Sequence, residues 1–175
     1  MAMYRKLGKA SAQRNALLRN QVTQLLYHGK IRTRAKEVVK IAEKLITLAI
    51  KEKDNYDEVT VTAKVAKKDK DGKRVKEVVD GKKVTAYDEV EKTIKKDQPS
   101  RLHARREMLK VLYPVVEVPT DAAGKKAGTK KVDLTSKLFD EYGTKYAGRK
   151  GGYTRIIKIG QRKGDQALEV ILELV

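Results

Sequence analysis

The chain has 175 residues, enough for one or at most two small domains with a buried core. It contains no cysteine, which excludes disulfides, cysteine-based zinc sites and thiolate nucleophiles. Its formal net charge is +18, an excess that is favourable where a polyanion neutralises it, nucleic acid first and an anionic membrane surface second. No apolar run approaches the roughly 18 residues of a membrane span. No apolar block follows the first cations, so the sequence also predicts no secretory signal.

The positive charge is concentrated in two acid-free segments. Residues 1–36 and 144–163 together account for 16 of the +18, whereas residues 51–98 carry 14 cations and 12 acids. Because solvated surfaces usually intersperse both signs, we expect the cations of the two segments to be unpaired within the chain and to face phosphates outside it. They are Arg5, Lys6, Lys9, Arg14, Arg19, Lys30, Arg32, Arg34 and Lys36, and Lys145, Arg149, Lys150, Arg155, Lys158, Arg162 and Lys163.

The first third of the chain predicts a basic arm, two helices and a short strand. Residues 1–10 have no clear period and are expected to be extended. Ser11 is a plausible N-cap for a helix over about 12–28, and Gly29 is placed just past its end. The apolar face of this helix would comprise Leu18, Val22, Leu25 and Leu26. Lys30 to Thr33 is expected to be a strand with Ile31 buried, and residues 34–53 give the strongest helical pattern of the chain.

The middle of the chain changes character at about residue 54. Residues 54–98 alternate valine and threonine with polar side chains, and "KDG" and "VDGKKV" are turn signals. We therefore expect two or three strands in solvated hairpins, inserted into a single domain that comprises residues 11–175. A helix over 101–112, a loop over 113–131 and a short helix ending at Gly143 follow.

The C-terminal residues predict a β-hairpin. The first strand is expected at 153–159 and the second at 168–174, with Leu168, Val170, Leu172 and Leu174 alternating onto one face. Arg162 and Lys163 would lie at its tip. Together with the helices this indicates a two-layer α/β (α+β) fold, in which helices pack on a small mixed sheet.

Catalytic and metal-binding patterns are absent from the sequence. The two histidines, His28 and His103, have no partner at metal-ligand spacing. The stretch "AGRKGGYT" lacks the G-x-x-x-x-G-K-[ST] pattern of a phosphate loop, and a predicted strand follows it where a phosphate loop has a helix. We therefore expect no enzyme activity, no cofactor and no small-molecule substrate. Within the second basic segment, Tyr146 and Tyr153 are candidates either for stacking on bases or for the core. Gly148, Gly151 and Gly152 would admit a phosphate chain or simply serve a turn.

Three blocks resemble one known family. "LLRNQVTQLLYHGKIRT", "AEKLITLA" and "KLFDEYGTKYAGRKGGYTRIIKIGQRKGDQA" are similar to the L-seventeen family of bacterial large-subunit ribosomal proteins. The resemblance covers roughly residues 3–52 and 133–175, whereas 54–98 and 114–131 exceed the compact form of the family. It implies a cytoplasmic protein without catalytic role that binds large-subunit ribosomal RNA near the peptide exit region, beside neighbouring ribosomal proteins and away from membranes.

The resemblance also implies which residues contact the RNA. They are Arg5, Lys6, Lys9, Arg14, Arg19 and Asn20 in the first segment, and Arg149, Lys150, Gly151, Gly152, Tyr153, Thr154 and Arg155 in the second. The acid-free pattern itself adds Lys30, Arg32, Arg34, Lys145, Arg162 and Lys163.

Two other functions remain open from the sequence. A free nucleic-acid-binding regulator would use the basic helix over 101–112, with Arg101, Arg105 and Arg106 as its reading side chains. A nuclease-like enzyme would need carboxylates that converge on a metal ion, such as Asp133, Asp140 and Glu141.

Overall fold

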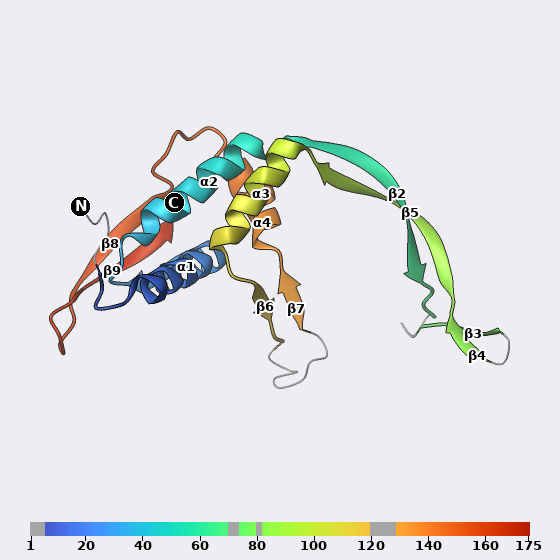
Figure 1. Ribbon diagram of the computed structural model, residues 1–175, viewed down its shortest axis with the longest axis horizontal. Helices are drawn as coiled ribbons and strands as arrows, with labels where there is room; N and C mark the ends of the chain where they lie inside the picture. The colour runs from blue at the N-terminus through green and yellow to red at the C-terminus, as the bar shows by residue number, and fades with distance from the viewer. Residues whose placement is uncertain (1–5, 70–73, 80–81, 120–128) are drawn as a thin grey trace. The chain divides into compact units, whose positions relative to one another are not determined.

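The computed structural model describes residues 6–69, 74–79, 82–119 and 129–175 (Figure 1). The chain divides into two units, one made of Met1–Asn55 with Pro99–Val175 and the other of Tyr56–Gln98. Helices and small antiparallel sheets together give an α+β fold. Arg5 lies outside the described residues.

The first unit is built on helices α1 (Ser11–His28), α2 (Val38–Glu52) and α3 (Pro99–Val111). The apolar face predicted for α1 is buried, and Gly29 ends the helix with φ +81° while its N–H donates to the carbonyl of Leu25 at 2.8 Å. The capping prediction is wrong, because Ala10 occupies the N-cap and Ser11 already belongs to the helix. No helix within the described residues is long and apolar enough to cross a membrane.

Residues 6–10 form a turn and not the extended arm that the sequence predicted. Leu7 and Gly8 both have positive φ, and the N–H of Lys9 donates to the carbonyl of Lys6 at 3.1 Å. The side chain of Leu7 packs against the hydrophobic core, which explains why the chain bends back at this point.

A three-stranded sheet in the order β1-β9-β8 lies against these helices, with β1 at Lys30–Thr33, β8 at Thr154–Gln161 and β9 at Leu168–Leu174 (Figure 1). Both pairings are antiparallel, so the sheet is not mixed as expected. Val170 and Leu172 of the central strand are buried in the core. In β1 the buried residue is Thr33 and not Ile31, because the Thr33 hydroxyl bonds to Gln21 and to the N–H of Ala35.

Residues 134–145 form one helical run in three segments, of which the middle one is a π-helix. It begins as α4 (Leu134–Lys137), continues as the π-helix η2 (Leu138–Tyr142) and ends as α5 (Gly143–Lys145). Gly143 therefore does not end the helix as predicted. A Cβ on Gly143 would lie 3.3 Å from the Cβ of Lys53, so the glycine lets α5 approach α2 closely.

The segment expected to be a loop over 113–131 contains a short hairpin. Strand β6 (Val115–Glu117) pairs with β7 (Lys130–Val132), and the Tyr27 hydroxyl donates to a carboxylate oxygen of Glu117 at 2.7 Å. Because each strand has only three residues, the alternation was too short to be recognised in the sequence.

The second unit is a β-ribbon. Strands β2 (Tyr56–Ala66) and β5 (Tyr87–Asp97) pair antiparallel over their full length, and β3 (Lys76–Val79) pairs with β4 (Lys82–Thr85). The described residues of this unit therefore form four strands, where two or three were predicted. Their side chains are mostly exposed, as the predicted solvated hairpins require.

Candidate nucleic-acid interface

The N-terminal turn lies beside the loop that joins β8 to β9. Leu7, Gly8, Arg34, Ala167 and Leu168 line a shared hollow of about 430 Å³, and the Lys6 and Lys9 side chains are exposed on the same turn. The fold thus brings the beginning of the first basic segment next to the end of the second.

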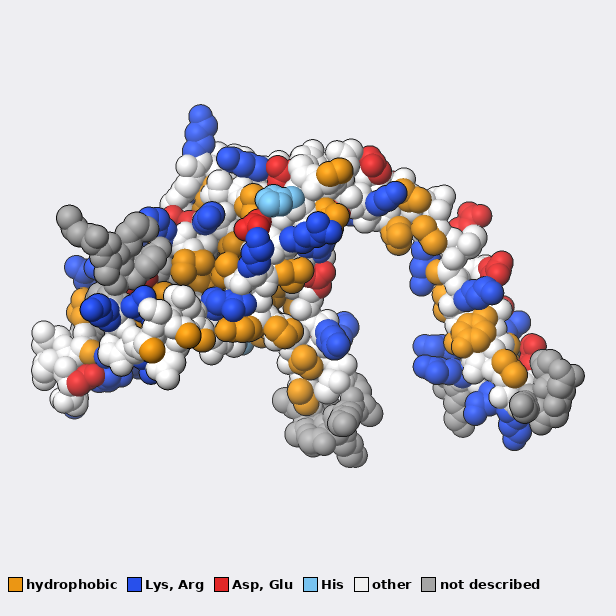
Figure 2. Space-filling view, in the orientation of Figure 1, with side chains coloured by type: hydrophobic (Ala, Val, Ile, Leu, Met, Phe, Trp, Pro, Cys, Tyr) orange, Lys and Arg blue, Asp and Glu red, His pale blue; other side chains and the backbone are white. Residues whose placement is uncertain are grey.

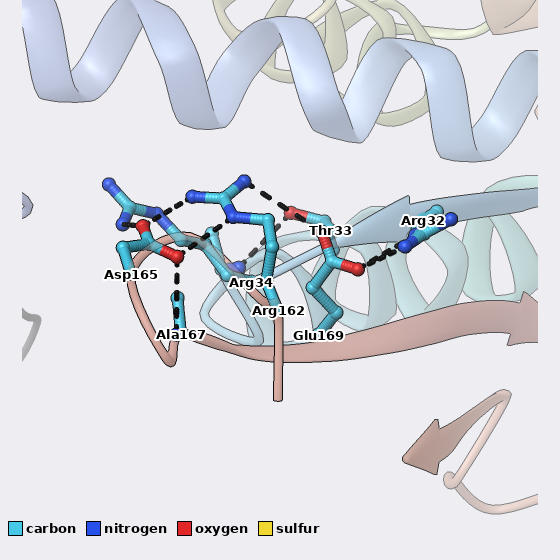
Figure 3. A network of polar contacts seen from close by, with 8 residues as sticks. Arg32, Thr33, Arg34, Arg162, Asp165, Ala167 and Glu169 are labelled. Atoms are coloured by element: carbon cyan, nitrogen blue, oxygen red, sulfur yellow. Dashed lines mark hydrogen bonds and ion pairs between the residues drawn. The ribbon is translucent and has the colours of Figure 1, made fainter. Parts of the chain in front are cut away.

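A network of ion pairs links the two basic segments through Asp165 and Glu169, two acids that follow the second segment (Figure 3). Arg32 on β1 binds Glu169 on β9, with 3.0 Å between Nε and Oε2. In the loop, Arg162 donates from Nε to Oδ1 of Asp165 at 2.9 Å, and its Nη1 lies 3.7 Å from Oε1 of Glu169. Arg34 completes the network at 3.8 Å from Asp165. Three guanidinium groups therefore share two carboxylates.

This network orients positive charge without cancelling it. The hydrogen bonds from Arg162, together with the backbone N–H of Ala167, hold the pKa of Asp165 well below its usual range. Asp165 is therefore ionised near neutral pH, and three guanidinium groups against two carboxylates leave the network one formal positive charge. Each guanidinium has five N–H donors and can bind phosphate oxygens through its planar fork. The side chains of Arg32, Arg34 and Arg162 are each about half exposed or more, so the paired arginines still reach the surface.

The expectation that all cations of the two segments are unpaired within the chain is wrong for four arginines. Besides the three in the network, Arg155 on β8 lies 3.3 Å from Glu173 on β9. The acids all lie in residues 165–173, immediately after the acid-free stretch, and antiparallel pairing folds them back onto it. Glu169 and Glu173 lie four residues apart on one face of β9, and this spacing is the sequence signal that identifies them.

The turn before β8 presents the glycines and two exposed cations. The N–H of Arg149 donates to the Tyr146 carbonyl at 2.9 Å, and its Nε donates to the Gly151 carbonyl at 3.2 Å. Gly152 has φ +61°, a conformation that favours glycine, so it serves the turn itself. Gly148 has no such constraint, and a Cβ there would meet nothing within 4 Å.

The two tyrosines of the second segment belong to the core. Tyr146 and Tyr153 are each 3% exposed, with ring centroids 5.2 Å apart. The Tyr146 hydroxyl donates to the carbonyl of Val175 at 2.7 Å, and the Tyr153 hydroxyl donates to that of Arg149 at 3.2 Å. Neither ring can stack on a base without leaving the core, so Tyr153 is removed from the candidate RNA contacts.

Thr154 and Arg19 are also occupied within the chain. The Thr154 hydroxyl donates to Oε1 of Glu43 at 2.9 Å and ties the start of β8 to α2. Arg19 donates from Nε to the carbonyl of Val111 at 3.1 Å, and its guanidinium lies 4.5 Å from the centroid of the Tyr113 ring. Both side chains stabilise packing within the first unit, so an RNA contact is not needed to explain why these residues are there.

Besides Arg19, eight of the cations predicted to contact RNA have no acidic partner within the described part of the chain. Figure 2 shows lysine and arginine side chains spread over the visible face of the first unit. Arg149 and Lys150 precede β8, whereas Lys163 follows it, so these cations are about 25 Å apart at a strand rise of roughly 3.3 Å per residue. The second basic segment is therefore two sites at opposite ends of one strand. The eight are Lys6, Lys9, Arg14, Lys30, Lys145, Arg149, Lys150 and Lys163.

Asn20, on the exposed side of α1, is also available for contact. Its amide group can both donate and accept hydrogen bonds.

Helix α3 is the basic helix of the regulator hypothesis, and it turns two of its three arginines inward. Arg101 is 2% exposed and lies 4.5 Å from the centroid of the Phe139 ring. Arg105 lies over the same ring at 5.4 Å and donates from Nη1 to the Thr135 hydroxyl at 2.6 Å. Only Arg106 of the three is exposed, so α3 does not present the row of side chains that reads a groove.

The carboxylates required by the enzyme hypothesis do not converge. Among the described residues, no three histidine or acidic side chains form a group that would hold a metal ion. Asp133 instead caps α4, where Oδ1 accepts from the N–H of Thr135 at 3.0 Å and of Ser136 at 3.2 Å. Partial burial alone would raise the pKa of Asp133, but the hydrogen bonds from Thr135 and Ser136 outweigh it and lower that pKa.

Comparison with known proteins decides the family. A family model described as "Ribosomal protein L17" matches residues 17–175. The chain belongs to the ribosomal protein L17 family. It is 72% identical over 178 residues to "Large ribosomal subunit protein bL17" of Lachnospira eligens, with all of both chains covered. It is 44% identical to the protein of the same name in Acetivibrio thermocellus, again over all of both chains, and 39% identical to that of Listeria innocua, over 98% of each. Membership in this family identifies a ribosomal protein and not an enzyme.

Proposed function

We propose that this protein is a structural component of the large ribosomal subunit in the cytoplasm, where it binds ribosomal RNA. Its relatives carry the name of a large-subunit protein over the full length of the chain. The observation that carries the proposal is the set of eight cations without acidic partners, which phosphates would neutralise. The resemblance of its sequence blocks to the family supports a position near the peptide exit region, beside other large-subunit proteins.

The proposed contact surface has three parts. The N-terminal turn contributes Lys6 and Lys9, together with Arg5 and the exposed side of α1. The ion-paired arginines of β1 and the β8–β9 loop form the second part, and their shared acids fix the guanidinium forks before RNA arrives. The turn at residues 147–152 forms the third.

The turn at residues 147–152 fits close approach to a phosphate chain. Arg149 and Lys150 are exposed there, and the open space beside Gly148 leaves its backbone accessible. Folded RNA is recognised mainly through its shape and its phosphates, which such a turn contacts without reading bases.

We infer that the first unit is one RNA-binding domain and that residues 56–98 are an appendage inserted into it. The acid-free segments both lie in the first unit. The insertion has nearly balanced charge, which supports a role other than phosphate neutralisation.

The test is incorporation into large subunits. In cells whose only copy of this protein carries Arg149→Glu and Lys150→Glu, we expect the variant to be depleted from large subunits after a moderate-salt wash. Lys40→Glu with Lys44→Glu is the matched control, because both lysines are exposed on α2, outside the candidate surface, and the charge change is the same. Equal retention of both double variants would contradict the proposed site, and absence of the wild-type protein from the subunits would contradict the function.

A further inference from the structure

Glu169 is an acid within the candidate RNA-binding surface. Val170 and Leu172 of β9 are buried in the core, so Glu169 lies on the outer face of the sheet by alternation. Its side chain is 14% exposed, whereas those of Arg32 and Arg162 beside it are 65% and 48% exposed. The carboxylate is therefore withdrawn from solvent, while the guanidinium groups that it binds reach the surface.

Glu169, on the central strand, binds one arginine on each side. Nε of Arg32, on β1, donates to Oε2 of Glu169 at 3.0 Å, and Nη2 of Arg32 donates to the same oxygen. On the other side, Nη1 of Arg162, directly after β8, lies 3.7 Å from Oε1 (Figure 3). Each carboxylate oxygen thus serves a different arginine. Gly160 is directly opposite Glu169 on β8, so that position supplies no side chain that competes for the carboxylate.

A carboxylate on this surface has two opposing effects on RNA binding. Its negative charge repels phosphates. Against this, an arginine has many rotamers, and RNA binding has to restrict them unless the side chain is already held. Glu169 holds two arginines with one charge, and both guanidinium groups shield that charge. We therefore expect the ordering of the arginines to outweigh the repulsion.

We propose that Glu169 is a positioning residue that strengthens RNA binding despite its negative charge, because it holds Arg32 and Arg162 in place for phosphates. The inference rests on the proposed function, since it needs RNA at this face of the sheet. Arg162 is also held from the loop, where its Nε donates to Oδ1 of Asp165 at 2.9 Å. Arg32 pairs with no other acid among the described residues, so its orientation depends on Glu169.

The first test compares two variants that each raise the net charge by one unit. Glu169→Gln keeps the length of the side chain, but an amide has an acceptor oxygen at one end and a donor nitrogen at the other, so it cannot accept from both arginines. We expect Glu169→Gln to bind protein-free large-subunit RNA roughly tenfold more weakly than the wild type. Glu107→Gln on α3 is the matched control, because Glu107 pairs with Lys110, outside the candidate surface. Its affinity should stay within about twofold of the wild type.

The second test separates positioning from a structural role. In a protein that carries Arg32→Gln and Arg162→Gln, Glu169 has neither arginine to hold, and only its repulsion of phosphates remains. Glu169→Gln should therefore strengthen binding roughly twofold in that background, the reverse of its effect in the wild type. Weaker binding in both backgrounds would show a structural role, and stronger binding in both would show repulsion alone. Any result without the reversal of sign overturns the proposal.

Folding and function are controlled separately. Thermal unfolding of each variant is measured first, and Glu169→Asp, which keeps the charge but is one methylene shorter, replaces Glu169→Gln if the latter does not fold. Glu169→Asp should also bind RNA more weakly than the wild type, because the shorter side chain cannot reach both arginines, and an unchanged affinity would overturn the proposal. A wild-type protein that shows no salt-dependent binding would instead contradict the proposed function.

Discussion

The salt dependence of RNA binding follows from the cations that lack acidic partners. We consider replacement of Lys6, Lys9, Lys150 and Lys163 by glutamine. All four are exposed, and none is ion-paired within the described residues, so no carboxylate there is left without a partner. The variant tests neutralisation of phosphates with little effect on folding.

The expected magnitude comes from counterion release. Each neutralised phosphate contributes about 0.7–0.9 to the slope of log K against log[salt]. The eight unpaired cations therefore predict a slope of about −6 to −7, and the fourfold variant should reduce its size by about 3. At 0.1 M salt the same four contacts correspond to a loss of affinity of roughly a thousandfold.

Filter binding to protein-free large-subunit RNA measures this slope. The KCl concentration is varied from about 0.05 to about 0.5 M, the range in which counterion release changes the affinity most. The matched control replaces Lys64, Lys67, Lys92 and Lys95 of the second unit by glutamine. Its slope should change by less than about 1. Equal changes of slope in the two variants would refute the reasoning, since net charge alone would then explain the binding.

Three further predictions concern stability and the insertion. The Tyr142 hydroxyl donates to the Leu26 carbonyl at 2.8 Å, so Tyr142→Phe should lower the free energy of unfolding by about 1 kcal/mol at pH 7. Burial raises the pKa of Tyr142 to about 12, so between about pH 10 and 12 the unfolded chain loses this proton before the folded protein does. The stability of the wild-type protein should therefore fall over this pH range, and that of the variant should fall less. Equal declines of the two proteins in urea titrations would contradict this. Gly152→Ala should destabilise the protein by about 1–2 kcal/mol in thermal unfolding, because φ of Gly152 is +61°. Gly148→Ala should leave the stability unchanged, because a Cβ there meets nothing within 4 Å. Equal effects of the two substitutions would contradict the left-handed conformation of Gly152 in the turn before β8. Replacement of residues 57–97 by a short glycine linker should leave affinity for free ribosomal RNA within about threefold, and a larger loss would show that the insertion contacts RNA.

Regular helices were predictable from the sequence because their apolar periods are long. The face of α1 and its end at Gly29 follow from spacing and from a glycine in the left-handed conformation. The run from 134 to 145 was extended beyond its predicted end because Gly143 serves packing against Lys53 and not chain reversal. From the sequence alone, a glycine that ends a helix cannot be distinguished from one that lets two helices pack closely. Only the tertiary contact distinguishes these two roles.

The candidate site was predictable in its charge and not in its geometry. Counting cations located both basic segments, but it could not reveal that Glu169 and Asp165 return to Arg32, Arg34 and Arg162 across the sheet. Nor could composition separate a stacking tyrosine from a core tyrosine, because Tyr153 is apolar on its ring and polar at its hydroxyl. These distinctions depend on strand pairing and burial, which are properties of the whole fold.

The account depends on phosphates being the partners of the unpaired cations. The most direct test is a density map of the large subunit from an organism that carries this protein, in which the nearest neighbour of each cation is identified. We predict that the side-chain nitrogens of Arg149, Lys150 and Lys163 lie within about 4 Å of phosphate oxygens. The account is contradicted if these side chains face bulk solvent while strands β2 and β5 of the second unit are surrounded by RNA.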